Sequence, residues 1–140
     1  MTTRAVRSAA FGIAGIGTAI SAYLVWVHYS GALAFCVGVG GCETVQSSPY
    51  AEVAGLPVAL LGLAAFAIAT ALTTVRLRAA ASASTLTGLF GLTLAGALFA
   101  LYLTYLELFV IHAVCPWCLA VDSAMVALFL LTVVELRGAP

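Results

Sequence analysis

The chain has 140 residues, of which 64% are hydrophobic and only 7% are charged, and its formal net charge is zero. An ordinary soluble domain carries about 25% charged residues and leaves roughly a third of its chain surface in water, so this composition excludes a soluble protein. The absence of a basic cluster also excludes an electrostatic nucleic-acid-binding surface. We therefore expect an integral membrane protein.

Four apolar segments are long enough to cross a bilayer as helices of about 20 residues. They cover about 9–27, 56–75, 86–110 and 116–135, and an outer loop of about 28–55 joins the first two. The second opens with Pro57, which suits a first helical turn. The first resembles a secretion signal, but it exceeds the roughly 7–15 apolar residues of a cleaved signal and other spans follow it. The sequence predicts an all-α integral membrane protein, a four-transmembrane-helix bundle that forms one domain over residues 1–140 and carries an extracytoplasmic cap loop.

The arginines predict the orientation of this bundle. Arg4 and Arg7 precede the first span, Arg76 and Arg78 lie between the second and third, and Arg137 follows the fourth. All five therefore fall on one side of a four-span protein, and the loops on the other side contain none. By the positive-inside rule, we expect both termini to be cytoplasmic.

Small residues four apart predict where helices approach closely. Gly17 with Ser21 and Gly91 with Ala95 have the small-x-x-x-small spacing of tightly packed membrane helices.

All four cysteines are predicted to lie on the extracytoplasmic face, where disulfides form and persist. If Pro116 occupies the first helical position, Cys115 is the cap residue and Cys118 lies in the first turn. The two sulfurs can then bond to each other, and the helix N-terminus stabilises a thiolate. We therefore interpret this pair as a reactive dithiol, with a structural disulfide as the alternative.

The second pair, Cys36 and Cys42, encloses the glycine-rich stretch "VGVGG" in the outer loop. A bond across so short a loop stabilises the fold weakly, so the pair is better suited to carrying electrons than to bracing the loop. A purely structural role stays open. Zinc is disfavoured, because this pair is not a C-x-x-C and neither His28 nor His112 has a usual ligand spacing from it.

The stretch "CETVQSSPYAEVAGLPVALLGL" (42–63), followed much later by "CPWC" at a span entrance, resembles the vitamin K epoxide reductase family in its bacterial form. The resemblance covers the whole four-span layout. Its most specific part is the order of a loop cysteine, a second one six residues on, Ser48, and then a C-x-x-C on the last span. Four-span quinone-linked oxidases of the other type carry the C-x-x-C in their first outer loop.

The resemblance implies a four-helix bundle around a quinone of the menaquinone or ubiquinone type, in the bacterial inner membrane. It implies that Cys36 and Cys42 receive electrons from a thioredoxin-like protein, that Cys42 exchanges with Cys115, and that Cys118 faces the quinone. Ser48 corresponds to a loop serine near the active site. Such proteins support disulfide formation in exported proteins.

Three departures from the family pattern change these expectations. Many bacterial members continue into a fused thioredoxin-like domain, whereas this chain ends at Pro140, so we expect the thiol partner to be a separate protein. The chain has no asparagine to hold a vitamin K head group, and Asp122 stands where vertebrate members have a tyrosine. The last two changes argue against vitamin K epoxide reduction and leave quinone reduction intact.

Several other polar or aromatic residues are candidates for supporting roles. Asp122 follows Cys118 by one helical turn, and its carboxyl either serves the quinone or forms an interhelical hydrogen bond. Tyr50 and Trp117 are expected to line the quinone pocket or to join Tyr23, Trp26 and Tyr29 in an interfacial aromatic belt. Glu107 and His112 lie near the C-x-x-C at the outer end of the third span, where either could relay protons, but we expect both to be solvated at the interface. His28 is expected to be interfacial too, and Glu43 and Glu52 are ordinary charges of the outer loop.

The sequence thus predicts a quinone-dependent thiol oxidoreductase that binds no metal. The alternatives are a non-catalytic membrane protein with two structural disulfides and, less favoured, a metal transporter.

Overall fold

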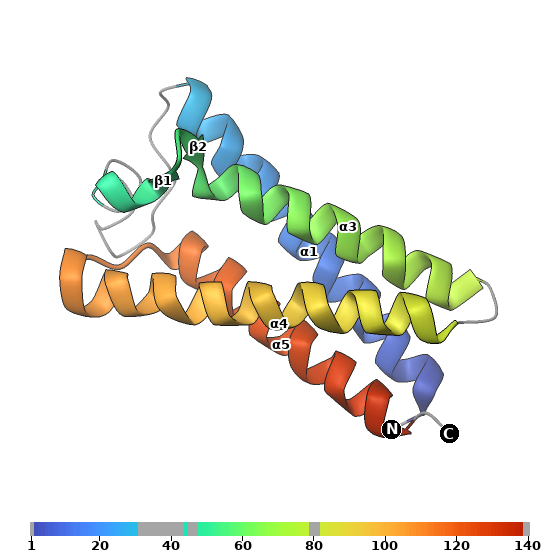
Figure 1. Ribbon diagram of the computed structural model, residues 1–140. Coiled ribbons are helices and arrows are strands. Elements are labelled where there is room, and N and C mark those ends of the chain that lie inside the picture. The colour runs from blue at the N-terminus through green and yellow to red at the C-terminus, as the bar shows by residue number, and fades with distance from the viewer. Residues whose placement is uncertain (1, 31–43, 45–47, 79–81, 139–140) are drawn as a thin grey trace.

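The structure, a computed structural model, describes residues 2–30, 44, 48–78 and 82–138. Its main helices are α1 (Thr3–Ser30), α3 (Val58–Arg78), α4 (Ala83–Tyr105) and α5 (Pro116–Gly138), which form an elongated bundle (Figure 1). A π-helical turn, η2 (Leu106–Ile111), continues α4. In the described part of the chain, four helices are long and apolar enough to cross a membrane, when η2 is counted with α4. The predicted four-helix membrane bundle is confirmed.

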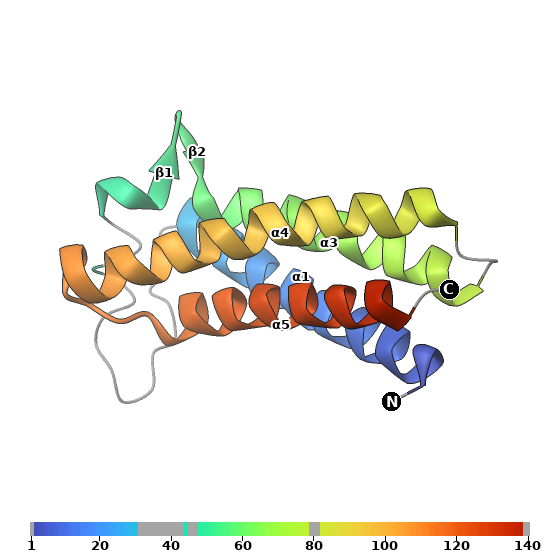
Figure 2. The same cartoon turned by 60° about the horizontal axis from the view of Figure 1, so that its bottom comes forward.

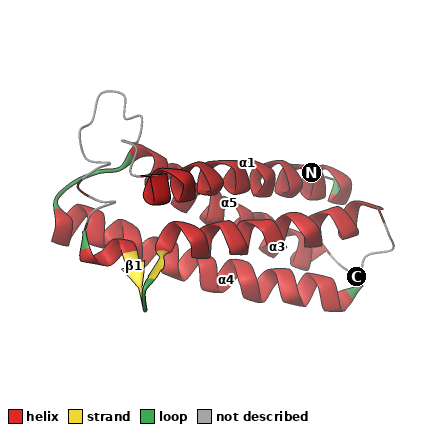
Figure 3. Ribbon diagram, turned by 90° about the horizontal axis from the view of Figure 1, so that it is seen from above, coloured by secondary structure: helices red, strands yellow, loops and turns green. Residues whose placement is uncertain are grey.

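The two ends of the bundle differ in what they carry. The start of α1, the end of α3, the start of α4 and the end of α5 lie together at one end, as Figures 1 and 2 show. All five arginines belong to helix turns at this end. The C-x-x-C at the start of α5 and a small hairpin before α3 lie at the opposite end (Figures 1 and 3). The arginines and the C-x-x-C therefore lie at opposite ends of the bundle.

The helices begin at local capping signals. Thr2 Oγ1 accepts a hydrogen bond from the Ala5 backbone N–H at 3.2 Å, and Ser82 Oγ accepts one from the Thr85 N–H at 3.2 Å. Each satisfies a backbone donor that the first helical turn leaves without an intrahelical partner. The helix α3 begins at Val58, so Pro57 lies one residue before it rather than inside its first turn.

A two-stranded hairpin in the outer connection was not predicted from the sequence. The strand β1 (Glu52–Val53) pairs antiparallel with β2 (Leu56–Pro57), directly after a short 3₁₀ turn, η1 (Pro49–Ala51). Its two turn residues both have positive φ, 53° at Ala54 and 83° at Gly55, which is the backbone of a type I′ turn. Glycine takes this conformation without strain.

The helices pack in an uneven ring. The most extensive contacts join α1 to α3, α4 to α5 and α1 to α5, whereas α3 and α4 contact each other far less. The centre is filled by a cluster of small and large buried apolar side chains, namely Ala10, Ala14, Phe66, Ala69, Leu89, Ala100, Met125 and Leu128. Among these pairs of neighbouring helices, α3 and α4 are therefore the least closely packed, and we call the line between them the seam.

Glycines allow two of these close contacts. A Cβ at Gly17 would overlap the ring of Phe66, and a Cβ at Gly96 would lie 2.7 Å from Met125 Sδ. Gly17 and Ser21 are both buried, in agreement with the predicted helix approach. The same prediction for Gly91 and Ala95 is wrong, because both are exposed and a Cβ at Gly91 would meet nothing within 4 Å.

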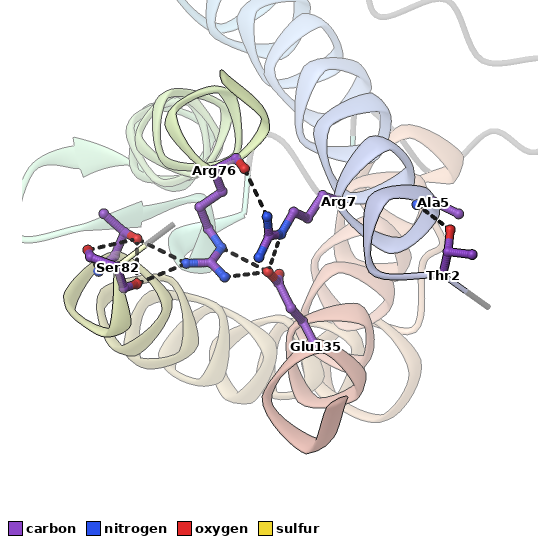
Figure 4. Close-up of polar contacts among 7 residues, drawn as sticks. Thr2, Ala5, Arg7, Arg76, Ser82 and Glu135 are labelled. Atoms are coloured by element: carbon purple, nitrogen blue, oxygen red, sulfur yellow. Dashed lines mark hydrogen bonds and ion pairs between the residues drawn. The ribbon is translucent and has the colours of Figure 1, made fainter. Parts of the chain in front are cut away.

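A buried ionic cluster joins the helices at the arginine end (Figure 4). Glu135 of α5 accepts hydrogen bonds from Arg7 Nε of α1 at 2.6 Å and from Arg76 Nε of α3 at 3.1 Å. Arg76 Nη2 contacts the same carboxylate oxygen. Arg76 Nη1 also donates to the Ser82 carbonyl at 3.1 Å and to Thr85 Oγ1 at 3.0 Å, at the start of α4. One carboxylate and two guanidinium groups therefore tie all four helices together at this end.

Candidate functional site

The C-x-x-C has the geometry that the sequence predicted for the start of α5. Pro116 is the first helical residue, and its missing N–H costs nothing at that position. Cys115 precedes it, is fully buried, and accepts the Cys118 backbone N–H on its sulfur at 3.3 Å. The Leu119 N–H donates to the Cys115 carbonyl at 3.0 Å. The Cys115 sulfur therefore occupies the capping position of a helix N-terminus, where backbone donors favour negative charge.

The chain reaches Cys115 through the π-helical turn η2. A π-turn adds one residue to the helical repeat, and such turns are frequent at functional sites. It ends at His112, which has the left-handed backbone (φ 56°), and the Ala113 N–H donates back to the Glu107 carbonyl at 3.2 Å. This geometry turns the chain from α4 towards α5.

The Glu107 side chain points inward, seven residues after the buried Ala100 and therefore on the same helix face. Only 3% of this residue is exposed, and its Oε2 accepts the Cys115 backbone N–H at 3.3 Å. The prediction of a solvated interfacial role for Glu107 is therefore wrong. His112, by contrast, is exposed.

Asp122 lies one helical turn below Cys118 and is 8% exposed. Its Oδ2 accepts a hydrogen bond from Thr104 Oγ1 of α4 at 2.9 Å. The interhelical hydrogen bond that the sequence offered as one reading is therefore present.

A cavity of about 390 Å³ lies beside the C-x-x-C and is lined by residues of all four helices and of the segment before α3. It extends along the seam between α3 and α4, with Leu61 and Gly62 on one side and Ala95 and Phe99 on the other. Most of its wall is apolar. The residues with polar side-chain groups on this wall are Ser21, Ser48, Tyr50, Glu107, Cys118 and Asp122.

Three of the four predicted supporting residues therefore line one cavity with Cys118, namely Ser48, Tyr50 and Asp122. Trp117 does not line it, and its ring lies 5.3 Å from that of Tyr23 on α1. Sequence reasoning missed Ser21, for which the available signal was a polar residue within a predicted span. It named Glu107 as a possible proton relay near the C-x-x-C but favoured a solvated position for it.

Ser21 offers a hydrogen-bonding group that the described residues do not satisfy. It is 1% exposed, and among the residues that the structure describes its hydroxyl has no hydrogen-bond partner. The hydroxyl lies at the α1–α3 contact, where a Cβ at Gly62 would be 3.4 Å away. An apolar cavity of this size with a few polar groups suits a flat, hydrophobic molecule that carries carbonyl oxygens. A quinone head group fits that description.

The outer end carries further aromatic and ionisable residues. His28 Nε2 lies 3.4 Å from Glu52 Oε1, and Trp26 and Tyr29 are largely exposed on α1. Cys36, Cys42 and Glu43 lie outside the described residues. Over residues 2–30, 44, 48–78 and 82–138, no three His, Cys, Asp or Glu side chains group as a metal site would require.

A comparison with protein-family models agrees with this geometry. The model described as "Vitamin K epoxide reductase family" matches residues 8–133, which include most of each spanning helix and all four cysteines. Members of this family are membrane thiol oxidoreductases and are linked to quinones in general. The chain therefore belongs to the vitamin K epoxide reductase family and is a membrane oxidoreductase that acts on thiols.

Proposed function

We propose that this protein oxidises the thiols of a separate thioredoxin-like protein and passes the electrons to a quinone of the menaquinone or ubiquinone type. The electrons would enter at Cys36 and Cys42 and continue through Cys115 and Cys118. The observation that carries the proposal is the position of Cys118, on the wall of an apolar cavity inside a membrane-spanning bundle and in the first turn of α5. A dithiol placed there can exchange electrons with a lipid-soluble acceptor.

The first half of the cycle is thiol–disulfide exchange. A reduced partner thiol attacks the Cys36–Cys42 bond, most directly at Cys36, and the released Cys42 thiolate attacks Cys115 of the oxidised C-x-x-C. Cys118 then leaves as the thiolate and takes up a proton. The second thiol of the partner attacks the partner–Cys36 bond, which releases Cys36 and closes the partner's own disulfide. Cys36 finally attacks Cys42 of the Cys42–Cys115 bond, which restores the Cys36–Cys42 disulfide and leaves Cys115 as a thiol. Every step exchanges one disulfide for another, so the direction follows from the relative reduction potentials. In total, the partner loses two electrons and its two thiols become a disulfide.

The second half returns the C-x-x-C to its disulfide. A bound quinone supplies an acceptor for two electrons and two protons. Cys118 lies on the cavity wall, and the backbone N–H that points at the Cys115 sulfur supports charge on that atom during exchange. Asp122, held by Thr104, presents a carboxyl to the same cavity one turn deeper. The chain lacks an asparagine for the vitamin K head group, so the proposed substrate is a quinone and not its epoxide.

The orientation in the membrane is part of the proposal. All five arginines lie at one end of the bundle, which supports a cytoplasmic location for that end and for both termini. The C-x-x-C end would then face the extracytoplasmic side of a bacterial inner membrane. Disulfide formation in exported proteins takes place on that side.

The first test removes the sulfur of Cys118. Purified Cys118→Ala protein, given dithiothreitol and a short-chain quinone analogue, is expected to lose quinone reduction. Ser123→Ala is the matched control, because Ser123 is exposed on the same helix. Full activity in Cys118→Ala would favour the alternative of a non-catalytic protein with two structural disulfides.

The second test identifies the thiol partner. Cys115→Ala removes the sulfur that Cys42 is proposed to attack, so a mixed disulfide between the outer loop and a thioredoxin-like protein is expected to accumulate. Mass spectrometry of the trapped complex would show which loop cysteine carries the bond. A bond at Cys42 alone would contradict the proposed entry at Cys36.

A further inference from the structure

Glu107 is a buried carboxyl that the proposed electron route does not use. It is 3% exposed within a helix long enough to span the membrane, where a carboxyl is costly and usually serves a function. Glu107 also lies within the π-turn η2, a departure from regular helix geometry that is frequent at functional sites. Its side chain contacts the residue on which the proposed chemistry depends, through the Cys115 N–H at 3.3 Å.

The two cysteines differ in their access to the cavity. Cys118 is one of the lining residues, whereas Cys115 is fully buried and is not. A proton that leaves Cys118 can therefore enter the cavity directly. A proton that leaves Cys115 needs a carrier, and Glu107 both contacts Cys115 and lines the cavity.

The other ionisable groups on the cavity wall are placed differently. Asp122 of α5 is engaged by Thr104, and Tyr50 lies in the segment before α3. The described residues of α1 and α3 bring no ionisable side chain to this wall. Glu107 is thus the carboxyl that links Cys115 to the cavity.

We propose that Glu107 carries the proton that Cys115 exchanges with the cavity, an inference that rests on the proposed function. Glu107 also holds the Cys115 backbone in place. When the disulfide forms, two S–H bonds break and one S–S bond forms. Two electrons pass to the quinone, and its two oxygens each gain a proton. One proton comes directly from Cys118, and the other comes from Cys115 through Glu107.

Two substitutions separate proton transfer from positioning. Glu107→Gln keeps a side-chain oxygen that can accept the Cys115 N–H but cannot carry the proton. Glu107→Leu removes both functions. Glu52→Gln is the matched control, because Glu52 is a half-exposed carboxyl near the same end of the bundle and is not a lining residue.

A spectroscopic test needs no quinone. The purified protein is reduced electrochemically while the infrared carboxyl C=O stretch is followed. We expect a carboxyl band that appears or disappears with the redox state in wild type and in Glu52→Gln, and that is absent in Glu107→Gln. An unchanged band in Glu107→Gln would assign the proton to another group and overturn the proposal.

Kinetics supply the second measurement. A missing proton carrier lowers kcat by about 100-fold, at the lower end of general acid–base effects, with little change in KM for the quinone. We expect this loss in Glu107→Gln and a larger one in Glu107→Leu, at unchanged solubility and helix content. Wild-type kcat in Glu107→Gln would leave the carboxyl a positioning group only. If wild type and Glu52→Gln also fail to reduce quinone, the proposed function itself fails.

Discussion

Replacing Glu135 by glutamine is expected to destabilise the bundle at the arginine end, because Glu135 is the buried counter-charge of two arginines. The side chain of Glu135 is 4% exposed and meets Arg7 Nε at 2.6 Å and Arg76 Nε at 3.1 Å. Glutamine keeps the shape and one acceptor oxygen but removes the only negative charge among the described cluster residues. The two guanidinium groups would then face each other without a counter-charge.

The size of the effect follows from the burial of the partners. Removing one member of a buried ion pair costs about 3–5 kcal/mol. The Arg7 side chain is 26% exposed and reaches water, and Arg76 keeps its bonds to the Ser82 carbonyl and to Thr85. Both facts reduce the penalty, so we expect a loss of about 2–3 kcal/mol in the free energy of unfolding.

Reversible unfolding in mixed micelles, followed by far-ultraviolet circular dichroism, measures this loss. Arg78→Gln is the matched control, because Arg78 is exposed and lies only two residues beyond Arg76. A surface change of that kind shifts the free energy of unfolding by within about 0.5 kcal/mol. If Glu135→Gln shifts it no more than Arg78→Gln does, the cluster contributes nothing measurable and the reasoning is wrong.

Two further predictions use matched pairs of buried and exposed positions. Gly17→Ala should lower the free energy of unfolding by about 1–3 kcal/mol, because its methyl group overlaps the Phe66 ring. Gly91→Ala should not, since a Cβ there meets nothing within 4 Å, and equal losses in the same unfolding assay would contradict this packing. Ser21→Ala should weaken quinone binding by about threefold to tenfold, the value of one neutral hydrogen bond. Thr93→Val is its control, because the buried Thr93 hydroxyl is bonded to its own helix at 2.8 Å, and equal binding by both variants, measured by fluorescence titration, would exclude a Ser21 contact.

The sequence was sufficient for the features that depend on local chemistry. Long apolar runs predicted the four helices, because a bilayer leaves few other ways to satisfy the backbone. The proline after Cys115 predicted where α5 begins, since proline is tolerated at a first helical position. The arginine pattern predicted which helix ends lie together.

The features that depend on distant partners were not predictable in this way. Glu135 is 128 residues from Arg7 in the sequence. The order of residues within one span does not indicate which residue of another span will pair with it. Glu107 was placed at the solvated interface because it lies near the outer end of its span, whereas its hydrogen-bond donor, the Cys115 N–H, comes from the segment before α5. Gly91 was mistaken for a contact because small residues also occur on faces that meet lipid.

The loose packing between α3 and α4 has a consequence for how the quinone and the thiol partner reach the site. The cavity runs along this seam, where Leu61 and Ala95 are exposed on the face that would meet lipid tails. A lipid-soluble acceptor would therefore approach within the plane of the bilayer, and its apparent affinity would scale with its mole fraction in the membrane rather than with its concentration in water. The thiol partner would come from the aqueous side, at the C-x-x-C end. The two reactants would thus be delivered from different phases and would not compete for one entrance.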